Sequence, residues 1–207
     1  IDRDRKFDIT ISKIFDGKKE KIIKKVLKRK YNIQRIDGLE ESKVTPPESV
    51  YKRIKEENNK IGEARAIDSD LPFFKNQFIM PVKGIISGVY GSQRILNSKP
   101  RSPHKGIDIA ASIGTTILAP SSGIIKLSEE DMFFTGKTVI LDHGLGLISI
   151  LAHLDKISVK VGEKVSKGDR VGTVGMTGRA TGPHLHWGVY LNDISVDPMA
   201  LLNYELR

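Results

Sequence analysis

The chain has 207 residues, no cysteine and a formal net charge of +9 at pH 7. The absence of cysteine excludes disulfides and thiolate metal sites, so any transition metal must be held by imidazole and carboxylate groups. No run approaches the ~20 apolar residues of a membrane-spanning helix, so we expect no stable membrane insertion of this chain. The positive charge suits polyanionic surroundings such as cell-wall polymer, or an ordinary solvated surface.

Residues 1–40 are expected to form a β-hairpin or the remnant of an accessory β-domain. Phe7, Ile9 and Ile11 alternate with polar residues as they do in a strand, and Asp16-Gly17 is a turn signal before a lysine-rich segment. We interpret that segment as the second strand, although its composition is also compatible with a helix.

Residues 41–77 are expected to form a linker that contains a helix from about 46 to 66. Thr45 is a suitable N-cap, Pro46 suits the first helical position, and Glu48 lies three residues after the cap. We expect this helix either to shield the functional site or to brace the sheet described next.

Residues 78–207 are expected to form the main domain, with a mainly β fold. The texture changes here to short alternating segments separated by glycines, such as GIISGVYG and HLHWGVYL. Many short strands with turn signals and no convincing helix predict an antiparallel, sandwich-like β-sheet.

All five histidines lie in this second region, and four polar residues have the spacing of metal ligands. His104 and Asp108 are four residues apart, and His184 and His186 are two apart, so in extended strands each pair points to one face. Two such faces can converge on one ion. Zinc accepts imidazole and carboxylate ligands, and three protein ligands leave a position for water, which predicts hydrolysis.

The individual roles stay partly open at this point. His184 and His186 cannot easily both reach a metal from one strand, so one is expected to be a ligand and the other a free imidazole. His153, at the end of the apolar run LISILAHL, supplies another free imidazole, and such a pair can provide general base, general acid and oxyanion stabilisation. We expect His143 and Asp142 to have turn or surface roles.

The segments PHKGIDIA, LAHL and TGPHLHWGV, in this order, resemble the signature segments of the lysostaphin-type (LytM-domain) zinc metalloendopeptidases. Those enzymes cut peptidoglycan cross-links or stem peptides. The similarity covers residues 78–202. It implies an antiparallel β-sheet with an open groove, a peptidoglycan-peptide substrate, and a location in the periplasm or cell envelope of a bacterium, although this chain carries no signal segment.

The same resemblance implies a role for each histidine of the motifs. His104, Asp108 and His186 would bind one Zn²⁺ per chain. His153 and His184 would be the unligated catalytic pair, with the roles within that pair undivided.

Four further residues are candidates for substrate binding. Arg94 and Arg101 flank the first motif and could pair with the carboxylates of stem peptides, or serve solubility and loop structure. Phe133 and Phe134 stand where relatives have a Gly-Tyr-Gly-like turn, and they could line the groove or be buried. Leu151 replaces the aromatic residue that commonly precedes Ala-His in the third motif.

Other function classes have weaker support. A catalytically silent, wall-binding activator would be expected to lack ligands, whereas every ligand position is filled. The segments GTTILAPSSGII and VKVGEKVSKGDRVG resemble the hairpin halves of biotinyl and lipoyl domains. The long histidine-bearing insertion here tells against such a carrier role. Nucleic-acid binding is suggested by charge alone, without a motif, so no nucleic-acid partner is expected. The sequence contains no signal for the oligomeric state.

Overall fold

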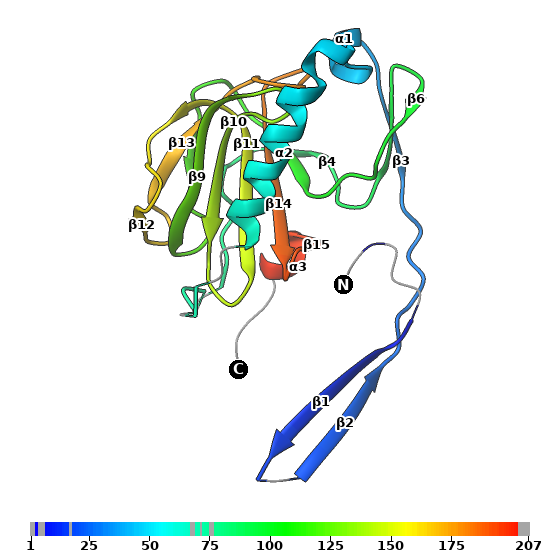
Figure 1. Cartoon of the computed structure of the whole chain (residues 1–207), viewed down its shortest axis with the longest axis vertical. Helices are drawn as coiled ribbons and strands as arrows, with labels where there is room; N and C mark the ends of the chain where they lie inside the picture. Colours follow the sequence, from blue (N-terminus) through cyan, green and yellow to red (C-terminus); the bar gives the residue numbers. More distant parts are fainter. Residues whose placement is uncertain are drawn as a thin grey trace.

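The structure, a computed structural model, describes residues 3, 7–16, 18–66, 69–70, 72–74 and 77–202. A large antiparallel sheet forms its centre, with the strand order β12-β9-β10-β11-β14-β7-β4 (Figure 1). The strands of this path are β4 (Ile85–Gly88), β7 (Ile107–Ala110), β9 (Gly123–Met132), β10 (Gly136–Asp142), β11 (Leu147–Ile157), β12 (Lys164–Val165) and β14 (His184–Leu191). The mainly β, antiparallel fold predicted from the sequence is therefore confirmed.

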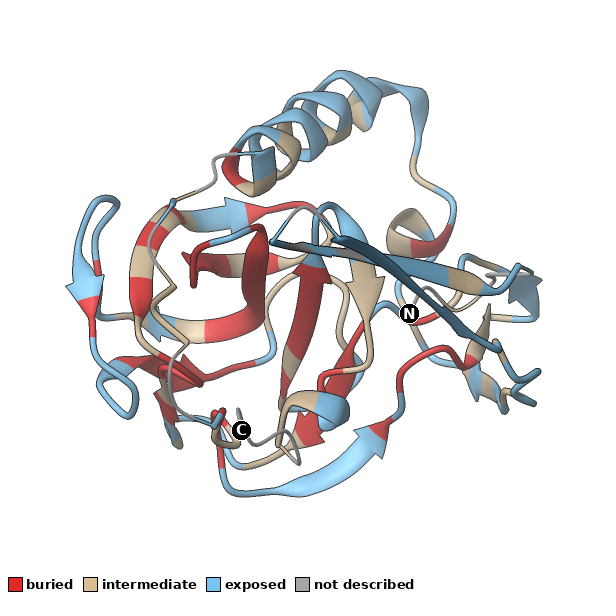
Figure 2. Cartoon of the chain, turned by 90° about the horizontal axis from the view of Figure 1, so that it is seen from below, coloured by how far each residue is buried: buried red, intermediate tan, exposed pale blue. Residues whose placement is uncertain are grey.

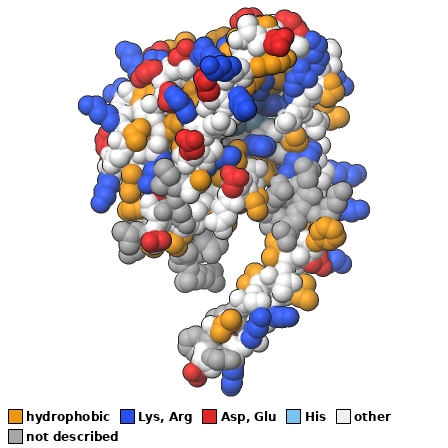
Figure 3. Space-filling view, in the orientation of Figure 1, with side chains coloured by type: hydrophobic (Ala, Val, Ile, Leu, Met, Phe, Trp, Pro, Cys, Tyr) orange, Lys and Arg blue, Asp and Glu red, His pale blue; other side chains and the backbone are white. Residues whose placement is uncertain are grey.

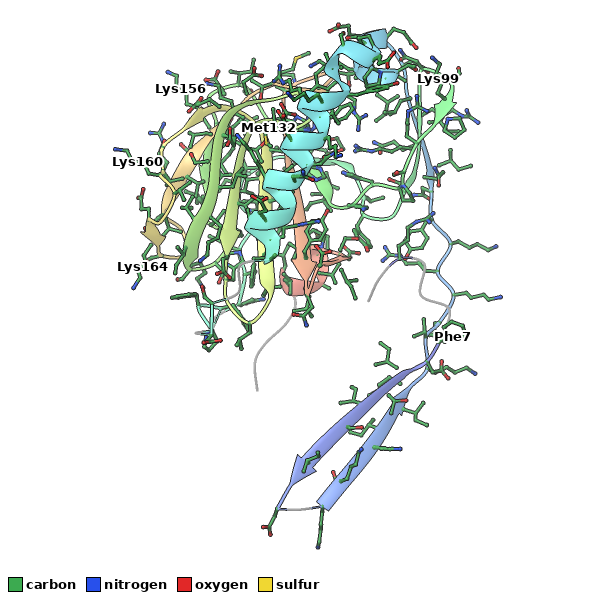
Figure 4. The ribbon with its side chains drawn as sticks, viewed as in Figure 1. Phe7, Lys99, Met132, Lys156, Lys160 and Lys164 are labelled. Atoms are coloured by element: carbon green, nitrogen blue, oxygen red, sulfur yellow. The ribbon has the colours of Figure 1, made fainter. Side chains whose placement is uncertain are left out.

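Three shorter strands complete the sheet. Strand β13 (Arg170–Val174) pairs with β11 and with β8 (Thr116–Leu118), and β15 (Ile194–Val196) pairs with β14. Lys156, Lys160 and Lys164 point away from the body of the molecule on the side where β12 and β13 lie (Figure 4). Charged side chains at a sheet edge disfavour pairing with another chain.

The hydrophobic core lies on both faces of the central strands. Residues 147–154 of β11 are all buried, which requires cover on each face of the sheet. Figure 2 shows buried residues gathered along the strands at the centre of the molecule. Leu151 and Trp187, both 0% exposed, belong to the main cluster. A second cluster, which contains Met132 and Ile140, lies beneath a helix (Figure 4). The strands that carry the functional histidines are thereby held rigidly.

That helix is α2, which spans Tyr51–Ala66 and follows α1 (Glu41–Val44) and a 3₁₀ turn (Glu48–Val50). It begins at Tyr51 and not near residue 46, because the chain is extended at Pro47, where ψ is 155°. The Thr45 hydroxyl does not cap a helix; it accepts a hydrogen bond from Lys99 Nζ at 2.8 Å. The predicted start of the helix was therefore wrong, while its observed end at Ala66 matches the prediction.

The helix α2 packs against the outer face of the sheet. Ala64 is 4% exposed and joins the second cluster, with Ile61 packed beside it. Ion pairs join Lys60 to Glu129 and Arg53 to Asp131 along the same contact. These contacts favour the bracing alternative for this helix.

The N-terminal strands β1 (Ile9–Phe15) and β2 (Lys18–Lys24) form an antiparallel hairpin that projects from the body of the molecule (Figure 1). This agrees with the predicted hairpin, although residue 17 of its turn lies outside the described residues. Every residue of β2 is exposed, and Phe7, at the base of the hairpin, is 78% exposed (Figure 4). None of the side chains that the structure describes in this hairpin belongs to the main core.

Strand β3 (Ile33–Ile36) leaves the hairpin and joins the rest of the protein. It pairs in parallel with β5 (Gln93–Leu96), which in turn pairs with β6 (Lys99–Pro100). This pairing crosses the boundary predicted near residue 40, because residues 33–36 form one sheet with residues 93–100. The division of the chain into three parts otherwise stays a prediction.

The last described element is the short helix α3 (Met199–Leu202). Within the described residues, no helix has both the length and the apolar character needed to cross a membrane.

Candidate metal centre and active site

Two neighbouring strands bring the predicted ligands together. Strands β7 and β14 are antiparallel, and their register places Asp108 directly opposite His186. Asp108 Oδ1 lies 2.8 Å from His186 Nδ1, and His104, just before β7, places Nε2 3.0 Å from both atoms. The two faces therefore converge as the spacing predicted.

The three donor atoms fit a divalent ion of the size of zinc. They all lie within 4.8 Å of one another. With zinc–ligand bonds of about 2.0–2.1 Å, tetrahedral ligands are roughly 3.3 Å apart, so a small outward shift would suffice. His104 Nδ1–H donates to Val89 O at 3.1 Å, which leaves the Nε2 lone pair free to bind a metal.

The protonation states also suit metal binding. Burial lowers the pKa of His104 to about 4, so its imidazole is neutral at pH 7. Burial alone would raise the pKa of Asp108, but the neighbouring His104 and His186 and the Arg94 guanidinium hold it well below its usual value. Two imidazoles without extra protons and one carboxylate are the forms that bind zinc.

Two glycines make room for the ligands. A Cβ atom at Gly88 would lie 2.5 Å from Asp108 Oδ2, and one at Gly106 would lie 2.8 Å from His186 Cε1. These distances are too short for real contacts, so a side chain at either position would displace a ligand. Gly106 lies between His104 and Asp108 in the PHKGID segment, and this position in the sequence is the signal that could have identified it as a residue that makes room for a ligand.

The other two histidines of the motifs face each other beside the metal ligands. The ring centroids of His153 and His184 are 4.7 Å apart. His153 Nδ1 donates to Thr177 O and His184 Nδ1 donates to Gly182 O, each at 2.8 Å. Because both Nδ1 atoms carry the proton, each Nε2 offers a free lone pair. Neither ring belongs to the ligand cluster.

His153 is held in an unusual backbone conformation. Its φ is +66°, and the register of β11 shifts next to it, which is typical of a β-bulge. The bulge turns this side chain toward the site. Burial, followed by the nearby His184 and His186, lowers the pKa of His153 to about 3, so its ring is neutral at pH 7.

These histidines open into a cavity of about 250 Å³, and Figure 3 shows histidine at the bottom of a hollow rimmed by Lys and Arg. Asp108, His153 and His184 are among the residues that line it. Gln34 and Leu39 line it too, so the segment around β3 forms part of the wall. No residue of α2 does so among the described residues.

Arg94 and Arg101 occupy different places around this cavity. Arg94 lines it and donates from Nη2 to Asp108 Oδ2, while its Nε donates to Gln34 Oε1 at 3.4 Å. Arg101 is not a lining residue, and its guanidinium donates to Val44 O at 2.8 Å. A direct contact with substrate stays a prediction for both residues. Arg94 also holds the carboxylate of Asp108 in place.

We expect Arg94→Gln to weaken zinc binding about 10- to 100-fold, the usual cost of losing a partner that orients a ligand. The reason is that Arg94 holds Asp108 Oδ2 and so directs Oδ1 toward the two imidazoles. The measurement is zinc affinity by competition with a chromophoric chelator. Arg35→Gln, at an exposed position of β3, is the matched control. Equal affinities for the two variants would contradict the role of Arg94.

The two phenylalanines differ in exposure. Phe133 is 7% exposed and packs edge-on against Phe134 and beneath the ammonium group of Lys43, so its ring serves packing rather than lining the cavity. Phe134 is partly exposed and stacks against Arg179, which does line the cavity. A part for Phe134 in substrate binding therefore remains a prediction, and it would act by way of Arg179.

His143 belongs to neither the ligand cluster nor the cavity lining, and it lies in a buried chain of hydrogen bonds. It follows β10 at a turn, as predicted, but it is 0% exposed, so a surface role was wrong. Its Nδ1 donates to Ser122 O at 2.8 Å. Trp187 Nε1 donates to Ser149 Oγ at 3.2 Å, and that hydroxyl donates to His143 Nε2 at 2.8 Å. The chain of bonds requires a neutral imidazole. Asp142 is also buried, and it accepts from the backbone of Gly144.

This network predicts a loss of stability in acid. Burial lowers the pKa of His143 to about 4 from a normal 6.5, so the unfolded chain binds more protons between these values. Stability is fully present above pH 6.5 and falls by about 3 kcal/mol as the pH drops to 4. Between pH 7 and pH 4, we expect the free energy of unfolding of the zinc-loaded protein to fall by about 3 kcal/mol more than that of zinc-loaded His143→Gln. Urea unfolding at the two pH values measures this difference. Equal losses would exclude this role for His143.

The antiparallel sheet thus brings two histidines and one aspartate together in an arrangement that could hold a metal ion. Residues 102–198 match the family model described as Peptidase family M23. A crystal structure from Pseudomonas aeruginosa, described as a peptidase M23, is 34% identical with a TM-score of 0.73, over 94% of this chain and 73% of that one. The chain belongs to peptidase family M23, which confirms the family expected from the sequence.

Two curated relatives describe the kind of activity found in similar proteins. An uncharacterised metalloprotease of Buchnera aphidicola is 36% identical over 148 residues, or 71% of this chain and 39% of the relative. The peptidoglycan DD-endopeptidase ShyA of Vibrio cholerae is 38% identical over 102 residues, or 49% of this chain and 24% of the relative. The chain thus spans well under half the length of these curated relatives.

Proposed function

We propose that this chain is a zinc-dependent endopeptidase that hydrolyses peptide bonds in peptidoglycan stem peptides or cross-links. The observation that carries the proposal is the pair of free imidazoles, His153 and His184, placed beside a complete three-ligand cluster. The name of the Vibrio cholerae relative supports the substrate class. The same reasoning supports a location in the bacterial cell envelope, such as the periplasm.

His104, Asp108 and His186 would hold the metal. Zinc fits best because two imidazoles and one carboxylate suit a tetrahedral site, and the single cluster of this kind among the described residues supports one ion per chain. When bound, zinc would polarise the substrate carbonyl and lower the pKa of a coordinated water. Arg94 keeps Asp108 in the orientation that this requires.

The free imidazoles would move the protons. A neutral ring with Nδ1–H fixed by a carbonyl accepts a proton from the attacking water at Nε2, and the same Nε2–H can then donate to the leaving amine. The second ring can donate a hydrogen bond to the oxyanion that develops on the carbonyl. The division of these two roles between His153 and His184 is left open.

The alternative, a silent activator of another wall hydrolase, has less support. Such a protein needs neither the three ligands nor the two backbone-oriented imidazoles. Here all five groups are present, and His153 is held by a backbone conformation that costs free energy, which is typical of functional sites.

Digestion of purified peptidoglycan sacculi tests the proposal. We expect the zinc-loaded protein to release soluble peptide-linked fragments. Treatment with a chelator should stop the release, and added zinc should restore it, because the ion is held by only three side chains. Fragment analysis by mass spectrometry identifies the bond that is cut. Intact sacculi after incubation with protein of proven zinc content would contradict the endopeptidase function.

A further inference from the structure

Arg179 is a cation inside the cavity without an acidic partner. It lies in the loop between β13 and β14 and lines the same cavity as His153 and His184. No ion pair within 4.0 Å joins it to an acidic side chain of the described part of the chain. Its protein partners are the Lys43 carbonyl, to which Nη1 donates at 3.4 Å, and the ring of Phe134.

The surroundings make this arrangement costly for a positive charge. Burial, followed by the nearby Arg94 and Arg101, lowers the pKa of Arg179 to about 10. The side chain nevertheless stays charged at neutral pH. Arg179 is partly buried, and a cation that has lost part of its hydration is normally paired with a counter-ion that offsets the loss. The missing counter-ion indicates that one arrives from outside.

The protein does not supply that counter-ion within the cavity. Asp108 is the one acidic residue among the described residues that line it. Both of its carboxylate oxygens are already engaged, Oδ1 by the two imidazoles and Oδ2 by Arg94. A bound divalent cation would add further positive charge. The cavity is therefore electropositive around Arg179 and suits an anionic group.

The geometry around the guanidinium favours a planar anion. The carbon Cζ of Arg179 lies 4.5 Å from the centroid of the Phe134 ring, and the Arg179 backbone N–H donates to Phe134 O at 2.8 Å. Stacking on a ring fixes the plane of the guanidinium and leaves its edge N–H groups available. Guanidinium edges pair with carboxylates through two parallel hydrogen bonds.

We propose that Arg179 binds a carboxylate of the peptide substrate next to the bond that is cut, with Phe134 holding the guanidinium in place. The proposal rests on the proposed function, and it narrows the substrate class to peptides that carry a free carboxylate close to the scissile bond. Arg179 thus determines specificity, whereas His153 and His184 carry out the reaction. It also gives Phe134 an indirect part in substrate choice.

A set of matched synthetic substrates tests this. Branched stem-peptide dimers are prepared with every carboxylate free, and with each carboxylate converted in turn to a carboxamide. We expect the zinc-loaded wild-type protein to prefer the free form of one particular carboxylate by roughly 10- to 100-fold in kcat/KM, the discrimination typical of a charge-assisted hydrogen bond. The difference should appear mainly in KM, because the contact exists before the reaction.

Variants of Arg179 complete the experiment. Arg179→Gln should cleave the free and the amidated substrate equally well, at the wild-type rate for the amide. Arg179→Lys should keep part of the preference. Arg170→Gln, an exposed arginine on β13, should keep all of it. Zinc content and thermal unfolding of each variant show that the site and the fold are intact.

The outcomes separate this proposal from the proposed function. If the wild-type protein cuts all substrates at similar rates, or if Arg179→Gln and Arg179→Lys both keep the full preference, the carboxylate site is refuted while the endopeptidase function stands. If zinc-loaded wild-type protein cuts neither these peptides nor sacculi, the endopeptidase function is refuted, and the carboxylate site with it.

Discussion

Replacing His186 with alanine is expected to abolish stable zinc binding and, with it, hydrolysis of peptidoglycan. His186 Nδ1 is one of three donor atoms, and it lies 3.0 Å from His104 Nε2 and 2.8 Å from Asp108 Oδ1. Two remaining ligands cannot form a tetrahedral site. The loss of affinity should exceed the roughly 10- to 100-fold cost of a change outside the ligand set.

Zinc content by atomic emission and fragment release from sacculi are the two measurements. The matched control is His143→Gln, which also replaces a buried histidine but lies outside the ligand cluster. We expect this control to keep one zinc per chain and full activity at neutral pH and moderate temperature. If His186→Ala still contained one zinc per chain, the assigned ligand set would be wrong.

The second large effect is expected from His153→Ala and His184→Ala. Each variant should keep its zinc, because neither ring belongs to the ligand cluster, yet each should lose about 10²- to 10⁴-fold in turnover. The reason is that each Nε2 has a free lone pair that can accept a proton beside the bond being cut, and the resulting Nε2–H can donate that proton.

The comparison of zinc content with turnover distinguishes the enzyme from a silent activator. If the protein is an enzyme, the His153 and His184 variants keep their zinc content but lose turnover. His186→Ala loses both zinc content and turnover. A silent activator predicts that both variants behave as the wild type in every wall-hydrolysis assay. Wild-type turnover in His153→Ala together with His184→Ala would therefore overturn the proposed mechanism.

Much of the metal centre could be read from local sequence patterns. The alternation of side chains in a strand places His184 and His186 on one face, and the five-residue segment from His104 to Asp108 brings both of its polar ends to the same side. The resemblance then indicated which residue would bind the metal. Local periodicity was sufficient here because β7 and β14 are hydrogen-bonded neighbours.

The N-terminal half shows where local patterns failed. Thr45 and Pro46 have the composition of a helix start, but Thr45 instead binds Lys99 from β6, and α2 begins only at Tyr51. A capping signal describes what a residue can do for a helix, and a tertiary contact that satisfies the same hydroxyl can compete with it.

The sequence by itself determined the fold class, the family and which histidines are candidates for the site, because these depend on periodicity and on contiguous motifs. Only the tertiary structure revealed that Gln34 supports Arg94, that Arg94 holds Asp108, and that Arg179 has no acidic partner among the described residues that line the cavity. These contacts join residues from distant parts of the chain. Their energetics depend on burial and on the absence of competing charges, neither of which a local pattern records.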